Sequence, residues 1–219
     1  MSTRRVPVIE RIMGANDTQA ADNRRIFDEH GVHVVNIMAA PGAGKTSLIL
    51  ETVRRLQGEL RIGAIEGDVA STVDTDKVRA GGAPAVQINT GGGCHLDAKQ
   101  VAQSLNEFPL DEVDLVFIEN VGNLICPVGF ALGEHTRVAI SSVPEGDDKP
   151  YKYPKIYANV DALVINKIDL LPYLPFDLEA FQKLVRSLNP DIELFPVSCV
   201  TGEGMDAWTS WLQNLARAE

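Results

Sequence analysis

The chain has 219 residues, of which 45% are hydrophobic, and this is enough to bury the core of one α/β domain. Its formal net charge is −10 and its acidic residues are spread along the sequence, which argues against binding to the phosphate backbone of a nucleic acid. Residues 1–7 have no apolar stretch and no later segment reaches spanning length, so we expect a cytoplasmic protein and neither export nor membrane insertion.

Apolar runs alternate with helical patterns along the chain. A polar, peripheral helix is expected first, with an N-cap near Asn16 and a stop at Gly31. Strands are then predicted at residues 32–39, 61–65, 85–88, 113–119, 137–143, 162–165 and 193–197. Helices are predicted at residues 46–56, 74–79, 96–108, 151–157, 178–188 and 204–215. Several strands are apolar on both faces, so the pattern predicts a three-layer α/β sandwich with a mostly parallel sheet.

A phosphate-binding loop lies between the first strand and the helix that follows it. The strand runs into a turn of small residues and then into Gly44-Lys45-Thr46. In this order, backbone N–H groups face a polyphosphate, Lys45 adds a point charge, and the Thr46 hydroxyl can bind Mg²⁺. Ala39 stands where the first glycine of such loops is usual, so its backbone must lie in a region that alanine tolerates. The expected nucleotide contacts are Gly42, Ala43, Gly44, Lys45, Thr46 and Ser47.

A second motif, Asn166-Lys167-Ile168-Asp169, follows a buried strand and looks like a guanine reader. The Asp169 carboxylate can accept hydrogen bonds from the guanine ring N–H and exocyclic amine, a pair that adenine does not present. Asn166 and the stem of Lys167 would support the loop and the face of the base. The alternative is a solvated loop whose acid caps the next segment. Another loop resembles the one whose backbone closes over the base in GTPases, and it consists of Ser198, Cys199 and Val200.

Two carboxylates are candidates for the magnesium and γ-phosphate end of this site. Asp68 follows a strand, which suits a magnesium or water-positioning group, although it could instead cap the following helix. Glu119-Asn120-Val121-Gly122 looks like the Asp-x-x-Gly switch of GTPases with Glu in place of Asp. We expect Glu119 to be an outer-shell magnesium partner and the Gly122 N–H to sense the γ-phosphate. Lys45, Asp68 and Glu119 are then the catalytic residues, and intrinsic turnover is slow because no arginine finger is evident.

Cysteine and histidine supply a candidate metal site. Cys94 and His95 follow a glycine run at a predicted helix start, where the pKa of a cysteine is lowered. Cys126 lies four residues after Gly122, so a metal that it binds would respond to the nucleotide. Three ligands are too few for a closed zinc site, but two chains related by a two-fold axis could share one site. Nickel and zinc are both compatible with these ligands.

The combination of motifs resembles the HypB family of hydrogenase nickel-incorporation GTPases, from about Val32 to the end of the chain. The segments that carry the resemblance are residues 40–46, 66–68, 92–97, 119–127, 144–154 and 166–169. The resemblance implies a GTPase of the SIMIBI class of P-loop NTPases that helps deliver nickel to NiFe hydrogenase. It also implies that Cys94, His95 and Cys126 bind nickel or zinc at a homodimer interface favoured by GTP. The implied partners are a HypA-like zinc accessory protein and the precursor of the hydrogenase large subunit.

Other features refine this expectation. No cysteine or histidine precedes His30, so we do not expect the nickel storage for which some family members carry N-terminal clusters. Residues 1–31 are interpreted as an N-terminal segment and residues 32–219 as one P-loop GTPase domain. Lys149 or Lys152 is expected to contact nucleotide or a second chain.

Three alternatives stay open at this stage. A urease-type nickel GTPase usually has a Cys-Pro-His triplet where this chain has Cys94-His95 without the proline. A small-molecule kinase would use the same phosphate loop with ATP, and the guanine-reading motif argues against it. A passive metal-binding module would have a vestigial nucleotide site, and loss of hydrolysis on replacing Lys45 would exclude it.

Overall fold

The computed structural model describes residues 8–68 and 72–218, and residues 1–7, for which no export signal is expected, lie outside this part. Seven parallel strands form one sheet in the order β3-β2-β4-β1-β5-β6-β7. Their bounds are β1 (His33–Ala39), β2 (Ile62–Asp68), β3 (Ala85–Asn89), β4 (Leu115–Glu119), β5 (Thr136–Ser142), β6 (Ala162–Asn166) and β7 (Glu193–Pro196). The predicted strands are confirmed and differ only at their ends.

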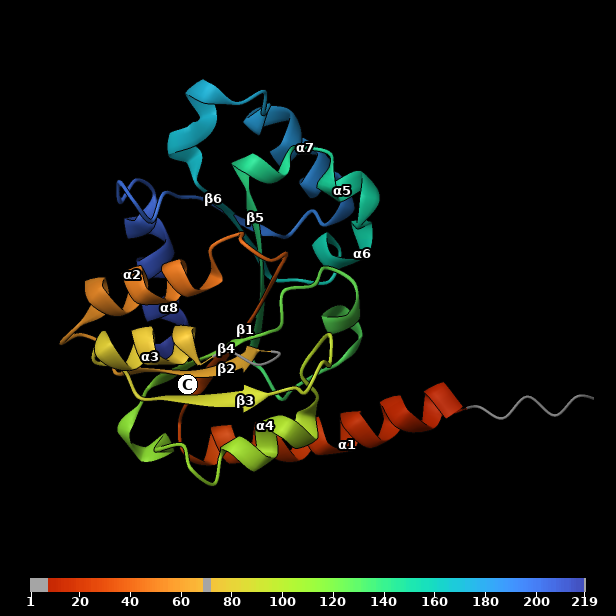
Figure 1. Cartoon of the computed structure of the whole chain (residues 1–219), viewed down its shortest axis with the longest axis vertical. Coiled ribbons are helices and arrows are strands. Elements are labelled where there is room, and N and C mark those ends of the chain that lie inside the picture. Colours follow the sequence, from red (N-terminus) through yellow and green to blue (C-terminus); the bar gives the residue numbers. More distant parts are fainter. Residues whose placement is uncertain (1–7, 69–71, 219) are drawn as a thin grey trace, which may run out of the picture.

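Helices cover both faces of the sheet, which confirms the three-layer sandwich (Figure 1). They are α1 (Val8–Glu29), α2 (Lys45–Leu56), α3 (Val73–Ala80), α4 (Ala98–Ser104), α5 (Lys149–Lys152), α6 (Pro154–Tyr157), α7 (Leu178–Leu188) and α8 (Met205–Arg217). Helices α2, α3 and α8 share one hydrophobic cluster, whereas α1 and α4 pack on the opposite face. Short 3-10 turns lie at Leu110–Glu112, Cys126–Gly129, Val143–Glu145 and Ile168–Tyr173. None of the described helices is both long and apolar enough to cross a membrane.

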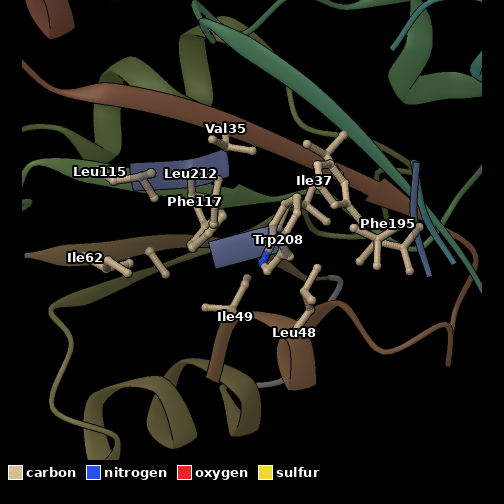
Figure 2. Close-up of a cluster of buried hydrophobic side chains, with 14 of the residues drawn as sticks. Val35, Ile37, Leu48, Ile49, Ile62, Leu115, Phe117, Phe195, Trp208 and Leu212 are labelled. Carbon is tan, nitrogen blue, oxygen red and sulfur yellow. The ribbon is translucent and has the colours of Figure 1, made fainter. Parts of the chain in front are cut away.

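The largest buried side chain is Trp208 of α8, which packs between the sheet and α2 (Figure 2). Its ring lies edge-on to Phe195, with 5.5 Å between the ring centroids. Its indole N–H donates to the Thr52 hydroxyl at 2.9 Å, so the polar group of the ring is satisfied inside the core. Truncating a buried tryptophan of this kind costs about 3–5 kcal/mol. This packing holds α2, and with it the phosphate loop, against the sheet.

The first helix differs from its prediction, because α1 begins at Val8 and packs on the domain instead of lying at its periphery. Phe27 is fully buried in the cluster that contains Val34 and Leu132. Asn16 does not cap the helix but lies within it, and Asn23 is also buried. The helix looked polar because these two asparagines face inward, where they bind backbone groups of other segments.

Two other helices also differ from their predictions. The helix predicted at residues 96–108 is shorter, because Asp97 caps α4 by accepting from the Gln100 N–H and the helix ends at Ser104. The helix predicted at residues 151–157 is divided into α5 and α6. Tyr153 leaves the helical region there, at φ −130° and ψ 52°, because a residue before proline is disfavoured in helical backbone.

Candidate functional site

A cavity of about 530 Å³ lies at the carboxyl edge of the sheet, where ligands bind in folds of this kind. It is surrounded by the phosphate loop, the end of β2, the start of α3 and the segment after β4. Its lining consists of Pro41, Gly42, Gly44, Lys45, Thr46, Ser47, Gly67, Asp68, Asp74, Lys77, Glu119, Asn120, Val121, Gly122 and Lys167. The fold therefore brings the phosphate loop, Asp68 and the predicted switch segment into one space.

The phosphate loop has the backbone geometry that its glycines require. Gly42 and Gly44 have φ angles of 77° and 103°, a region that residues with a side chain rarely adopt. A Cβ at Gly44 would also collide with the Asn166 amide. Ala39 is the last residue of β1 and has no positive φ, which confirms the expected backbone there. Alanine is tolerated because the strand extends through this position.

Lys45, Thr46 and Glu119 are in direct contact at the bottom of the cavity. The Thr46 hydroxyl donates to Glu119 at 3.1 Å, and Lys45 Nζ lies 3.7 Å from Glu119 Oε1. Lys45 and Glu119 are both buried. A charged pair out of water is tolerated only when its members are paired and hydrogen-bonded, as they are here. The lysine is thereby held at the helix start, and it lines the cavity.

A second buried carboxyl group, that of Glu66, lies beside Glu119, and sequence reasoning had assigned it no role. The two residues are opposite each other in the β2–β4 register. Burial raises the pKa of Glu66 to about 10, with the negative charge of Glu119 as the next cause. Burial also raises the pKa of Glu119, but Lys45 opposes that shift. Glu66 therefore holds a proton at neutral pH, whereas the Lys45 ammonium favours the charged form of Glu119. The sequence did offer one signal for Glu66. It lies two residues before Asp68 on the same strand, so both side chains are on the same face of the sheet.

The residues at this end of the cavity fit a magnesium ion. Hard oxygen ligands are present, namely the Thr46 hydroxyl and the Asp68 carboxylate, and Glu66 Oε1 is buried without a hydrogen-bond partner among the described residues. Asp68 ends β2, and Thr72 stands at the N-cap position of α3, so the alternative of Asp68 as that helix cap is wrong. Sequence reasoning missed Asp74 and Lys77, which form a 2.8 Å ion pair on α3 beside Asp68.

Gly122 lies directly against the phosphate loop. A Cβ at this position would come within 2.9 Å of Pro41 Cγ and 3.1 Å of Pro41 N. Only glycine allows the segment after β4 to approach the loop so closely. The predicted γ-phosphate sensor and the phosphate loop are therefore neighbours, and a phosphate bound between them would contact both.

The predicted base-reading loops meet on the other side of the phosphate loop. Asn166 donates to Ala43 O at 3.0 Å, and Lys167 Nζ donates to Gly42 O at 2.7 Å. Lys167 adopts a φ of 63° to make this turn. Asp169 Oδ1 is buried and has no hydrogen-bond partner among the described residues, which leaves an acceptor ready for a ligand donor.

The loop at residues 198–200 completes this side. Ser198 Oγ accepts from the Val200 and Thr201 N–H groups at 3.3 and 3.1 Å, which shapes the turn. Cys199 Sγ donates to Asn166 Oδ1 at 3.5 Å, so the two base-side loops are joined. Burial raises the pKa of Cys199 to about 11, which keeps it a neutral thiol. These contacts give Cys199 a packing role, whereas Cys94 and Cys126 belong to the candidate metal cluster.

Cys94, His95 and Cys126 form a compact cluster in which their possible ligand atoms all lie within 4.8 Å of one another. Cys94 Sγ is 3.4 Å from His95 Nδ1. The His95 ring stacks on Phe130 with 4.0 Å between centroids, and burial lowers its pKa, which favours the neutral form that binds metals. Two thiols and one imidazole suit a borderline ion such as nickel or zinc.

The acidity expected for Cys94 is wrong. Its pKa is raised, first by the hydrogen bond with Cys126 and then by burial. The helix that was expected to lower this pKa starts only at Ala98, so Cys94 lies in the preceding turn and outside the first helical residues. The same turn brings Cys94 and His95 to one side, although neighbours in extended backbone would point to opposite faces. An incoming cation must therefore displace the thiol protons.

Comparison with known proteins places these sites in context. Residues 33–196 match the family model described as the CobW/HypB/UreG nucleotide-binding domain. The chain is 46% identical over 215 residues to the hydrogenase maturation factor HypB of Escherichia coli K12, a match that covers 98% of this chain and 74% of that protein.

Solved structures agree with this match. The crystal structure of HypB from Archaeoglobus fulgidus aligns with a TM-score of 0.87 and 41% identity, covering 93% of this chain and 100% of that chain. HypB from Helicobacter pylori in complex with nickel aligns with a TM-score of 0.88 and 33% identity, covering 93% and 96%. The signal recognition particle receptor FtsY from Elizabethkingia anophelis shares the fold alone, with a TM-score of 0.52 and 16% identity over 75% and 56% of the two chains.

Proposed function

Because the chain belongs to the HypB family within the CobW/HypB/UreG nucleotide-binding proteins, we propose that it is a GTP-hydrolysing nickel chaperone that helps insert nickel into NiFe hydrogenase during maturation. The observation that carries the proposal is the position of the metal cluster. Cys126 follows the switch segment that touches the phosphate loop, and it lies within 4.8 Å of Cys94 and His95. A nucleotide that moves the switch segment would therefore move a nickel ligand.

The proposed nucleotide is GTP, and the proposed reaction is its hydrolysis to GDP and phosphate. The buried, unpartnered Asp169 Oδ1 supports guanine over adenine, because guanine presents two N–H donors to a carboxylate. This argues against the small-molecule kinase. The glycine conformations and the Lys45 pairing fit a working phosphate site, which argues against a passive metal-binding module.

Hydrolysis in this proposal depends on positioning and on neutralising charge. Lys45 would stabilise charge on the β- and γ-phosphates, and the Gly122 N–H would bind the γ-phosphate. Glu119 would orient the Thr46 hydroxyl and, as an outer-shell group, the magnesium ligands. Mg²⁺, held by Thr46 and Asp68, would supply charge neutralisation at the phosphates. Among the described residues no arginine lines the cavity, so intrinsic turnover should be slow.

The metal and partner assignments complete the proposal. Cys94, His95 and Cys126 would bind Ni²⁺ as cargo, or Zn²⁺ at the same site, and a homodimer formed in the GTP state would share the ion. A HypA-like zinc protein and the hydrogenase large-subunit precursor would be the partners, in the cytoplasm, where thiols stay reduced. Residues 32–219 would act as one GTPase domain, on which α1 of the N-terminal segment docks. A urease-type assignment is less suitable because the Cys-Pro-His triplet is absent.

An anaerobic nickel titration tests the proposal. The protein is loaded with GDP or with a non-hydrolysable GTP analogue, and nickel affinity, stoichiometry and mass by light scattering are measured together. We expect tighter nickel binding and a doubled mass with the analogue, and loss of both in Cys94→Ala. Cys199→Ala, which removes a thiol outside the cluster, serves as the matched control when each nucleotide is kept at saturation. If nickel affinity, stoichiometry and mass are the same with GDP and with the analogue, a GTPase without nucleotide-dependent nickel binding is the better description.

A second experiment tests the nucleotide site. Lys45→Ala should lose GTP hydrolysis, because the contact to the β- and γ-phosphates is removed. Normal hydrolysis by this variant would show that the phosphate loop is assigned wrongly. ATP added in place of GTP should compete poorly for binding, and equal binding of both nucleotides would support the kinase instead.

A further inference from the structure

The Asn120 side chain lies between the nucleotide cavity and the metal cluster. Asn120 follows Glu119 at the end of β4, lines the cavity and is almost fully buried. Its Oδ1 accepts from the Leu96 N–H at 3.1 Å and from the Val121 N–H at 3.0 Å. Leu96 follows His95 directly, so one amide oxygen binds the switch segment and the metal-bearing turn together.

The orientation of the Asn120 amide is fixed by hydrogen bonds that its Nδ2 side makes to a buried polar network. Asn120 Nδ2 donates to Asn36 Oδ1 at 3.3 Å, and Asn36 Nδ2 donates in turn to Glu134 Oε1 at 3.2 Å. Glu134 is held by Arg137 Nε and by the Leu132 N–H, both at 2.6 Å. In this series of hydrogen bonds each donor faces an acceptor. If the Asn120 amide were rotated by 180°, the Leu96 N–H and Asn36 Oδ1 would lose their partners. The Asn120 oxygen is therefore kept toward Leu96.

Further contacts join the same two segments. Asn123 Nδ2 donates to Cys94 O at 3.2 Å, and its Oδ1 accepts from the Ile125 N–H at 2.9 Å. Leu96 is fully buried against Gly67, where a Cβ would come within 2.7 Å of its side chain. Gly67 also lines the nucleotide cavity. The turn that carries Cys94 and His95 is thus bound on two sides by residues at the phosphate end of the site.

We propose that Asn120 is a positioning residue that couples the nucleotide state to the Cys94–His95 side of the metal cluster. The inference rests on the proposed function and adds a second connection to it. In the proposed function, Cys126 moves with the switch segment because it belongs to the same stretch of chain. Asn120 would make Cys94 and His95 move as well. Its side-chain Oδ1 accepts from the Leu96 N–H, and Asn120 itself directly precedes Val121 and Gly122 of the switch segment. All three ligands then respond to the nucleotide as one unit.

The test compares nickel affinity in two nucleotide states for several variants. The measured quantity is the ratio of the nickel dissociation constants with GDP and with a non-hydrolysable GTP analogue, under anaerobic conditions. For the parent protein we expect a ratio of at least about tenfold. In Asn120→Ala the ratio, measured with each nucleotide at saturation, should fall below about twofold. Asn120→Asp should keep part of the coupling, because a carboxylate oxygen still accepts from Leu96 N.

Controls separate coupling from folding. Asn189→Ala removes a partly buried asparagine that donates to Tyr157 O and Val160 O, away from both sites, and should keep the parent ratio. If Asn120→Ala does not fold, Asn123→Ala serves in its place, because it removes the bond to Cys94 O together with the bond from the Ile125 N–H and should also lower the ratio. A parent ratio retained in the folded Asn120 and Asn123 variants would overturn the inference. A parent ratio near one would instead refute nucleotide-dependent nickel binding itself, and the role of Asn120 with it.

Discussion

A single carboxylate oxygen without a hydrogen-bond partner gives the clearest information about which nucleotide base this protein would select. Asp169 Oδ1 is buried, and none of the described residues donates a hydrogen bond to it. A buried acceptor left unpaired costs about 1–3 kcal/mol, so a site of this kind is complete only with its ligand. Guanine offers two donors to a carboxylate, whereas xanthine presents a carbonyl oxygen at the position of the guanine amine.

Asp169→Asn should therefore exchange guanine for xanthine nucleotides. The new amide N–H would meet the xanthine carbonyl, and GDP would lose a carboxylate acceptor, so we expect GDP binding to weaken by at least about 100-fold and XDP binding to improve. Calorimetric titration with both nucleotides measures the exchange. The exposed Asp191 gives a matched control, since Asp191→Asn makes the same charge change away from the site. Unchanged GDP affinity in Asp169→Asn would rule out this residue as the base reader.

The reactivity of the cysteines provides a second prediction at this scale. Burial raises the pKa of Cys199 to about 11, so only about one molecule in a thousand carries its thiolate at pH 8. Cys94 is exposed and accessible. With iodoacetamide at pH 8, we expect Cys94 to be alkylated first and Cys199 last, as read by peptide mass spectrometry. Nickel added to the protein that already holds the GTP analogue should protect Cys94 and Cys126 and leave the rate at Cys199 unchanged. Faster alkylation of Cys199 than of Cys94 would contradict its packing role.

At the scale of elements, α1 connects the two segments that flank the metal cluster. Asn23 Nδ2 donates to Ala98 O at 2.7 Å and to Leu132 O at 2.9 Å. Asn16 makes the parallel pair of bonds, accepting from the Ala98 N–H and donating to Ala131 O. Gly133 lies so close that a Cβ there would come within 2.7 Å of Asn23 Cβ. The helix therefore holds the start of α4 and the segment before β5 at a fixed separation.

Asn23→Ala should destabilise the protein by about 2–4 kcal/mol, because two buried carbonyl groups lose their donor. Urea unfolding measures the free energy directly. Asp22→Ala, at a neighbouring exposed position, should change it by less than about 0.5 kcal/mol. We also expect weaker nickel binding in Asn23→Ala with either nucleotide, since the ligand segments are no longer held together. Equal stabilities of the two variants would mean that α1 is docked only by its apolar residues.

Ion pairs on α2 predict a dependence of stability on pH. Hydrogen bonds from Arg54, followed by those from Arg55, lower the pKa of Glu51 from 4.5 to about 2 against the opposing effect of burial. Arg55 also donates to Gly202 O, which ties α2 to the loop before α8. Because the folded pKa is below the unfolded one, the carboxylate stabilises the fold above about pH 4.5 and this contribution is lost as the pH falls toward 2.

Glu51→Gln should therefore cost about 1 kcal/mol at pH 7 and progressively less below pH 4.5. The free energy of unfolding in urea at pH 7, 5 and 3.5 measures the trend for variant and parent. Glu107→Gln changes an exposed glutamate and should show no such trend. A Glu51→Gln difference that stays constant over this pH range would show that the ion pairs do not shift its titration.

For the molecule as a whole, the sequence predicted the fold well because each strand and helix carries its own signal. The predicted phosphate loop, base-reading motif and metal cluster stay predictions, but their residues lie near one another as expected, since motifs at the ends of parallel strands gather at one edge of the sheet. Glu66, Asn120 and Asn23 were not assigned roles. Each is a polar residue whose partner is distant in sequence, such as Ala98 for Asn23, and neither periodicity nor a local motif reveals such a pairing.

The helix errors have the same physical origin. Helix α1 was expected to be peripheral because inward-facing asparagines look like a solvated face until their backbone partners are known. Tyr153 is the opposite case, since Pro154 is a local signal that disfavours helical backbone at the residue before it. Local rules thus locate the elements, while tertiary hydrogen bonds decide which faces are buried.

A last prediction concerns assembly of two copies. Each chain offers three soft or borderline ligands, and a fourth can come from a second copy placed on a two-fold axis. Ile125, next to Cys126, is 66% exposed, and it lines a cavity of about 230 Å³ with Lys149 and Tyr153. An apolar side chain this exposed beside an incomplete metal site is well suited to contact a second chain.

Ile125→Asp should therefore prevent dimerisation. A carboxylate placed opposite its own symmetry mate adds repulsion between two chains that each carry a net charge of −10. With nickel and the GTP analogue, light scattering should show a doubled mass for the parent and a monomer for the variant at the same concentration. Tyr173→Asp, at a residue that is 79% exposed outside this cavity, should dimerise like the parent because it adds the same charge elsewhere. If Ile125→Asp dimerises as well as Tyr173→Asp does, the shared ion must lie on another face, since a buried pair of carboxylates at this contact would not be tolerated.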